Sequence, residues 1–181
     1  MILFNLKEKE CDISMYDKIT EKDIKRMQEE IEYRKLVVRK KAIEDVQEAR
    51  AHGDLSENFE YKAAKQFKNQ NDSRIRYLEK MIKTAKIISE DSNADEVGLN
   101  KLVTVYVPED DAEETFKIVT TVRADSLKAL ISIDSPLGKA LLNHKVGDKV
   151  SVTVNENYSY DVIIRNIEEV QDDGTDPLRR F

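Results

Sequence analysis

The residues best placed to do chemistry are two carboxylates three positions apart, Asp54 and Glu57, which follow a glycine inside a long charged stretch. Gly53 suits the left-handed residue that ends a helix, and Asp54 suits the N-cap of the next helix. The spacing fits a capping box, in which Asp54 accepts from the backbone N–H of Glu57 and Glu57 reaches back. Carboxylates can also bind a metal ion. Both uses stay open, because a side chain can cap a helix in the free protein and bind a metal in a complex.

The segments on either side of this pair have the periodicity of helices. From Thr20 to about residue 52, and from Leu55 onward over a similar length, apolar residues recur about every three or four positions. Thr20 is a hydroxyl N-cap for the first helix. Two helices of equal length joined by a tight turn are expected to pack antiparallel. The sequence therefore predicts a coiled-coil domain over residues 15–90, with its acidic tip at 53–58.

The apolar seam of the first arm is predicted to consist of Ile24, Met27, Ile31, Val38, Ala42, Val46 and Ala49, and that of the second arm of Phe59, Ala63, Phe67, Ile75, Leu78, Ile82, Ala85 and Ile88.

The second half of the chain has a different period. A polar, turn-rich linker at 91–98 precedes segments in which apolar and polar residues alternate, which is typical of strands. The strands are expected at 103–107, 116–122, 129–134, 149–154 and 158–167, and a short helix over Ser135–Asn143 begins with an N-cap serine and a proline. Residues 99–170 thus predict a small mixed sheet with one helix, and residues 171–181 a disordered tail. The fold class is α+β.

Charge is divided unevenly between the two halves of a chain whose net charge is −6. Residues 15–90 hold 18 Lys and Arg against 15 Asp and Glu, whereas residues 91–181 hold 10 against 18. A protein that is acidic as a whole is a poor general binder of DNA, because affinity for phosphate comes from clustered cations. Any contact with nucleic acid is therefore expected in the first half.

The single cysteine, Cys11, cannot form an internal disulfide, which suits a reducing compartment. No segment has the pattern of a signal peptide or approaches the ~20 apolar residues of a membrane span. We therefore expect a cytoplasmic monomer that makes no contact with a membrane. Residues 1–14 are expected to form a flexible leader.

Two long motifs resemble a known family. The stretch Ala49–Ala64, which contains His52-Gly53-Asp54-Leu55-Ser56-Glu57-Asn58, resembles the tip motif of the bacterial GreA/GreB transcript-cleavage factors. The stretch Ile131–Leu142, followed by Lys145–Val150, resembles the second signature of that family. The resemblance covers roughly residues 15–170, with both motifs in the family's order and spacing.

The resemblance implies a protein whose coiled coil enters the secondary channel of bacterial RNA polymerase. Asp54 and Glu57 match the acidic pair of the family, which would act there as catalytic ligands of a Mg²⁺ ion shared with the polymerase and not held stably by the factor alone. The C-terminal domain, similar to an FKBP-type fold, would dock on the channel rim. Such a factor is no enzyme itself. It completes the polymerase site so that a backtracked RNA 3′ end is hydrolysed.

The resemblance also points to residues outside the acidic pair. Arg50 and Lys65 stand where the family carries basic residues near the tip, and they would contact RNA phosphates; the alternative is a solvated charged face. Asp134, Ser135 and Pro136 match the loop that docks on the polymerase, with a helix cap as the alternative. The chain lacks the family's usual glycine after Thr20 and its Pro-Gly-Gly hairpin, and neither departure touches the tip.

Three other functions remain open from the sequence. A paralogue could enter the same channel and inhibit or compete without cleavage, although such relatives alter the tip acids that this chain keeps. A coiled-coil adaptor would use the hairpin only to hold proteins together. A prolyl isomerase is suggested by the FKBP-type resemblance alone, and residues 98–170 offer few aromatic side chains for its pocket.

Overall fold

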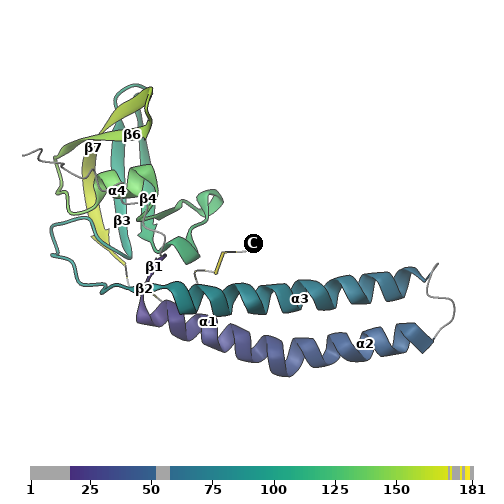
Figure 1. Cartoon of the computed structure of the whole chain (residues 1–181). Helices are drawn as coiled ribbons and strands as arrows, with labels where there is room; N and C mark the ends of the chain where they lie inside the picture. Colours follow the sequence, from purple (N-terminus) through teal and green to yellow (C-terminus); the bar gives the residue numbers. More distant parts are fainter. Residues whose placement is uncertain (1–16, 52–57, 171, 173–175, 177, 180–181) are drawn as a thin grey trace, which may run out of the picture.

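A computed structural model describes residues 17–51, 58–170, 172, 176, 178 and 179 of the chain. A long helical hairpin projects from a small sheet domain, as Figure 1 shows. The first arm consists of α1 (Glu21–Tyr33), a π-helical turn η1 (Arg34–Val38) and α2 (Arg39–Ala51), and the second arm is α3 (Phe59–Thr84). No helix in these ranges is long and apolar enough to cross a membrane.

The hairpin begins at Thr20, which is the predicted N-cap and which the structure shows to be part of a capping box. Its hydroxyl accepts from the N–H of Asp23, and the Asp23 carboxylate accepts from the N–H of Thr20, both at 3.2 Å. The second arm ends earlier than predicted, because Ala85 is extended and β2 (Lys86–Ile87) pairs in parallel with β1 (Lys18–Ile19). Ala85 and Ile88 therefore do not continue the helical seam.

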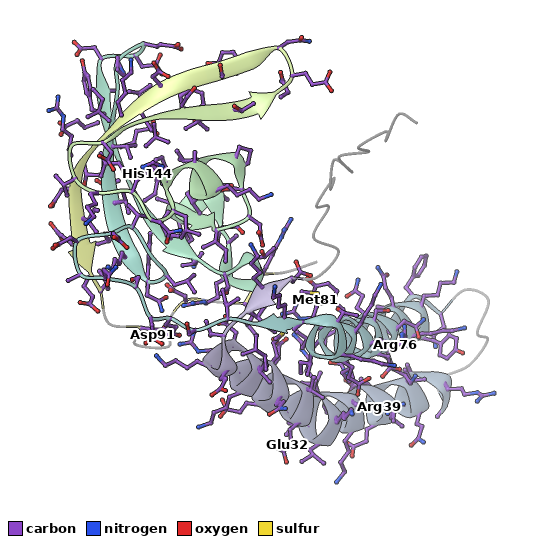
Figure 2. All side chains as sticks on the ribbon, turned by 60° about the vertical axis from the view of Figure 1, so that its left-hand side comes forward. Glu32, Arg39, Arg76, Met81, Asp91 and His144 are labelled. Carbon is purple, nitrogen blue, oxygen red and sulfur yellow. The ribbon has the colours of Figure 1, made fainter. Side chains whose placement is uncertain are left out.

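The apolar seam of the hairpin is concentrated at its base. Figure 2 places Met81 there and Arg39 and Arg76 farther along the two arms. Toward the tip the buried positions on the first arm are the small residues Ala42 and Ala49. The hairpin core therefore thins with distance from the sheet domain. The base cluster consists of Ile19, Met27, Ile31, Ile75, Leu78, Met81 and Val122.

A polar layer crosses the hairpin where the apolar pattern breaks at η1. Arg74 donates two hydrogen bonds to the Glu30 carboxylate, at 2.9 and 3.0 Å, and Arg34 donates another at 2.6 Å. Asn71 accepts from Arg34 at 3.1 Å. Burial alone would raise the pKa of Glu30, but the hydrogen bonds from Arg74 and Arg34 outweigh it, and the pKa lies below its ordinary value.

The C-terminal domain is a five-stranded mixed sheet in the order β5-β4-β3-β7-β6. Only the β4–β5 pair is parallel. The fourth helix, α4, is capped by Ser135 as predicted, and its Leu141 is fully buried in the core of the domain. The strands are β3 (Lys101–Val107), β4 (Ala112–Val119), β5 (Leu130–Ser132), β6 (Lys149–Asn155) and β7 (Tyr158–Glu169), and α4 spans Pro136–Leu141.

Two strand predictions needed correction. The predicted strand at 116–122 begins at Ala112 and ends at Val119, and the chain then forms the 3₁₀ turn η2 (Thr121–Arg123). The predicted strand at 129–134 is only β5, after a second 3₁₀ turn, η3 (Ser126–Lys128). The turns redirect the chain toward the hairpin, and Val122 joins the hairpin's apolar base.

A buried ionic cluster joins the sheet domain to the hairpin. Arg123 of η2 is completely buried, and its Nε lies 3.0 Å from Oδ1 of Asp23 in α1, which is also completely buried. Thr120 donates to the other oxygen of Asp23 at 2.7 Å. Nη1 of Arg123 donates to Asn100 at 2.9 Å. The cluster ties the first turn of α1 to two segments of the sheet domain.

Four described residues of the C-terminal segment also contact both domains, which differs from the predicted disordered tail. Asp172 pairs with Arg26 of α1 at 2.6 Å and with Arg123 at 3.3 Å. Asp176 pairs with Lys117 of β4 at 2.7 Å. Arg179 donates its N–H to Val122 at 2.7 Å and accepts from Arg74 at 2.6 Å, while Leu178 packs against the hairpin's base cluster.

The Glu30 layer makes a prediction about pH. Glu30→Gln should lower the free energy of unfolding at neutral pH by about 2 kcal/mol, because hydrogen bonds to a charged group are lost. A carboxylate with a depressed folded pKa stabilises above its unfolded pKa of ~4.3 and loses that contribution as pH falls through the folded pKa. Urea unfolding of variant and parent should therefore converge in strong acid. Glu32→Gln, an exposed change on the same helix, is the control, and an equal effect of both changes would contradict the assignment.

The ionic cluster makes a second prediction. Arg123→Met should reduce the free energy of unfolding by about 3–5 kcal/mol, because the buried carboxylates of Asp23 and Asp172 lose a shared partner. Arg165→Met removes an arginine whose side chain is about half exposed and 3.9 Å from Glu113, and it should cost less than about 1 kcal/mol. Urea unfolding compares the two. Similar losses would show that the cluster is not a main support of the fold.

Candidate functional site

Near the free end of the hairpin, the side chain of Asn58 links α2 to α3 by hydrogen bonds. Its Nδ2 donates to the carbonyl of Ala49 in α2 at 2.7 Å, and its Oδ1 accepts from the N–H of Tyr61 in α3 at 2.9 Å. The backbone carbonyl of Asn58 accepts the first helical hydrogen bond, from Lys62, at 3.2 Å. One side chain therefore caps the second arm and ties it to the last turn of the first.

This geometry corrects the N-cap expected from the sequence. The N-cap of α3 is Asn58, so Asp54 does not begin that helix. Asn and Asp are about equally good N-caps, and the asparagine also reaches across to the first arm because an amide can donate as well as accept. The acidic pair, Asp54 and Glu57, lies outside the described residues. The capping box proposed for this pair is not needed to start α3.

Arg50 and Lys65 are both exposed near this end of the hairpin. Lys65 Nζ lies 5.9 Å from the centre of the Tyr61 ring. Among the described residues, no carboxylate lies within ion-pair distance of either side chain. Three other cations of the arms are paired with acids: Lys41 with Asp45, and Arg39 and Lys68 with Asp72. Arg50 and Lys65 therefore differ from these three cations, although Lys40 and Lys62 likewise have no acid within ion-pair distance among the described residues.

The three candidate docking residues lie together at the start of α4. Ser135 caps the helix, since its Oγ accepts from Gly138 N–H at 3.0 Å and donates to the carbonyl of Ser132 at 2.7 Å. Pro136 occupies the first turn and is exposed. Asp134 accepts from Thr121 at 3.2 Å and lies 3.4 Å from Lys18 of β1. The cap predicted as the alternative role is present, and docking remains a prediction.

Sequence reasoning missed two residues at the hairpin end. Asn58 stands four positions after Asp54, and a local pattern cannot choose between two equivalent caps. Phe59 was assigned to the apolar seam, yet its side chain is 81% exposed. The spacing gave no signal of this exposure, because Phe59, Ala63 and Phe67 continue the pattern of a seam, yet Ala63 and Phe67 are exposed as well.

The protein combines a long antiparallel helical hairpin with a small mixed sheet. It belongs to the class of two-domain factors in which the hairpin carries the side chains of its free end away from the sheet domain. Comparison with known families agrees. A family model described as "Transcription elongation factor, N-terminal" matches residues 18–87, and one described as "Transcription elongation factor, GreA/GreB, C-term" matches residues 91–169. The chain belongs to the GreA/GreB family of transcription elongation factors.

Individual relatives agree with the family models. The chain is 46% identical over 135 residues to transcription elongation factor GreA of Geobacillus kaustophilus, covering 74% of this chain and 85% of that protein. It is 43% identical over 127 residues to GreA of Bacillus subtilis, covering 70% and 81%. A solved structure of the transcription factor Gfh1 aligns with a TM-score of 0.42 at 28% identity, over 84% of this chain and 97% of that one.

The dual role of Asn58 can be tested by two substitutions. Asn58→Ala should lower the free energy of unfolding by about 1–2 kcal/mol, because the N-cap and the link between the arms are both lost. Asn58→Asp keeps an acceptor for the N–H of Tyr61 but removes the donor to Ala49, so it should cost less. Thermal or urea unfolding measures both. If Asn58→Asp were as damaging as Asn58→Ala, the N-cap would contribute nothing measurable.

Proposed function

We propose that this protein enters the secondary channel of bacterial RNA polymerase and stimulates the polymerase to cleave backtracked RNA 3′ ends. The observation that carries the proposal is the hairpin end, where Asn58 supplies the cap of α3. The start of α3 therefore does not require the acidic pair, and we assign Asp54 and Glu57 a role in the complex with the polymerase. Family membership supports a function in transcription elongation.

Asp54 and Glu57 are the residues that would hold Mg²⁺ in the complex. Two carboxylates match the oxygen donors that Mg²⁺ takes alongside retained waters and further ligands. When bound there, the ion supplies charge stabilisation and an activated water for phosphoryl chemistry. Two carboxylates alone bind the ion weakly, so the polymerase would have to complete the coordination. On this proposal the protein is an activator of the polymerase and not an enzyme.

The cations near the tip fit the same role. Arg50 and Lys65 have no carboxylate within ion-pair distance among the described residues, so their charge is not already neutralised there. A lysine or arginine without such a partner can bind RNA phosphate without first giving up an ion pair. We assign both to the extruded RNA.

The sheet domain would supply the second attachment to the polymerase. Pro136 is exposed at the start of α4, beside the cap residue Ser135 and next to Asp134. The buried cluster around Arg123 joins this domain to the hairpin. A fixed connection would let docking on the rim direct the hairpin into the channel. We place the protein in the cytoplasm and expect it to act as a monomer.

The proposal is tested with a stalled elongation complex that carries end-labelled RNA. The wild-type protein should shorten the RNA in the presence of Mg²⁺, and the variant Asp54→Asn/Glu57→Gln should reduce the rate at least about 100-fold, as expected when a required metal ligand is lost. Binding of both proteins to the polymerase should be similar. Asp110→Asn/Glu109→Gln, in the β3–β4 turn, is a control with the same loss of charge.

The other outcomes favour the alternatives. Binding with inhibition, but without cleavage, would identify a competing paralogue. No binding to the polymerase would favour a coiled-coil adaptor. Equal cleavage by the wild-type protein and the Asp54→Asn/Glu57→Gln variant would show that these two carboxylates are not needed for cleavage.

A further inference from the structure

Phe59 is an unusually placed aromatic residue. Its side chain is 81% exposed, more than the other exposed aromatic residues that the structure describes, Tyr33 at 59%, Tyr158 at 52% and Phe67 at 49%. It belongs to neither apolar cluster of the protein. It is the first residue of α3, directly after Asn58. Packing within the described part of the protein does not account for a phenylalanine here.

The first turns of α3 pair two aromatic rings with two lysines. Lys62 Nζ lies 5.6 Å from the centre of the Phe59 ring, and Lys65 Nζ lies 5.9 Å from the centre of the Tyr61 ring. The spacings of three and four residues place each lysine beside its ring on the helix surface. Both distances are within the range of cation–π attraction. The pairs hold positive charge next to aromatic faces at the free end of the hairpin.

Aromatic rings interleaved with cations are the chemistry of single-strand nucleic-acid platforms. A base stacks on an exposed ring while nearby lysines attract the backbone phosphates. Stacking accepts every base, because each has a π-face. Backtracked RNA ends in whatever sequence was just transcribed, so a contact at its 3′ end must tolerate all four bases. A stacking residue meets that requirement better than hydrogen bonds to base edges.

We infer that Phe59 stacks on a nucleobase of the extruded RNA 3′ segment, and that Lys62 lies beside the adjoining phosphate. The inference rests on the proposed function, since it places RNA at the hairpin end. Stacking on Phe59 is a contact with the base of the RNA, whereas Arg50 and Lys65 are proposed to bind its phosphates. Phe59 follows Glu57 by two residues in the sequence, so stacking would hold the RNA near the acidic pair. Phe59 would thus position the RNA for cleavage.

The stacking of Phe59 on a base is tested by combining Phe59 variants with two RNAs, one with and one without the extruded bases. Stalled complexes are prepared with normal RNA and with RNA whose extruded nucleotides lack their bases. On normal RNA, Phe59→Ala should slow cleavage about tenfold at limiting factor concentration, within the range of loss for one base stack. On abasic RNA it should have no effect. Phe59→Trp should restore the rate on normal RNA, and Phe67→Ala, a less exposed phenylalanine two turns farther along α3, should behave as wild type.

Two further results would overturn the inference. An equal loss on both RNAs would show that Phe59 contacts the polymerase, and no loss on either would show that it contacts nothing required. Cleavage by wild type separates both results from failure of the proposed function. If wild type cleaves neither RNA, the proposed function falls and this inference falls with it.

A second measurement does not depend on cleavage. In the Asp54→Asn/Glu57→Gln background, a fluorescent adenine analogue at the RNA 3′ end should be quenched when the factor binds, because stacked fluorophores of this kind lose emission. Adding Phe59→Ala should abolish the quenching while polymerase binding is unchanged. Quenching that persists without Phe59 would contradict the stack.

Discussion

The structure depends on one buried ion pair, between Arg123 of η2 and Asp23 of α1. Both side chains are completely buried, and removing two charges from water is costly unless each is paired and hydrogen-bonded. Here the compensation is incomplete: Oδ1 of Asp23 and Nη2 of Arg123 have no hydrogen bond among the described residues. Removing one member of such a cluster is costly because it leaves a buried charge unpaired, but the intact cluster adds little net stability relative to apolar side chains and mainly fixes geometry. It favours one arrangement of the two domains, because sliding η2 along α1 would leave the buried carboxylate of Asp23 without its arginine.

The arrangement that Arg123 and Asp23 fix determines the direction of the hairpin, because the apolar contacts of the hairpin are concentrated at its base. Beyond the base cluster come the polar layer around Glu30 and then a stretch where the buried residues of the first arm are alanines. Small residues permit close approach of the arms but bury little apolar area. The direction of the free end is therefore set mainly at the junction, where Arg123 and the C-terminal contacts of Asp172 act. The cap at Asn58 then holds the two arms together at the opposite end.

The periodic parts of the fold could be predicted from the sequence, and the parts that depend on distant partners could not. The helices, the apolar base of the seams, the cap at Ser135 and the alternation in the sheet are local patterns, whereas Ala63 and Phe67 of the predicted seam are exposed. The short β1–β2 pair and the anchoring of Asp172 join residues far apart in the chain, and a two-residue strand or a single acid leaves no local signature. The N-cap of α3 was predicted at Asp54 and lies at Asn58 for a related reason. The hydrogen bond that distinguishes Asn58 goes to the carbonyl of Ala49, which lies on the other arm.

The shift of the cap from an acid to an amide bears on the chemistry of the site. A carboxylate that caps a helix accepts backbone N–H groups with the same lone pairs that a metal would need, so each ligand formed would cost a capping bond. A neutral amide avoids this competition, because Asn58 satisfies the helix and donates to the first arm without using charge. The start of α3 and its link to the first arm therefore do not depend on a carboxylate cap. On the proposed function, the structural role falls to Asn58 and the chemical role to Asp54 and Glu57, within a few residues of each other.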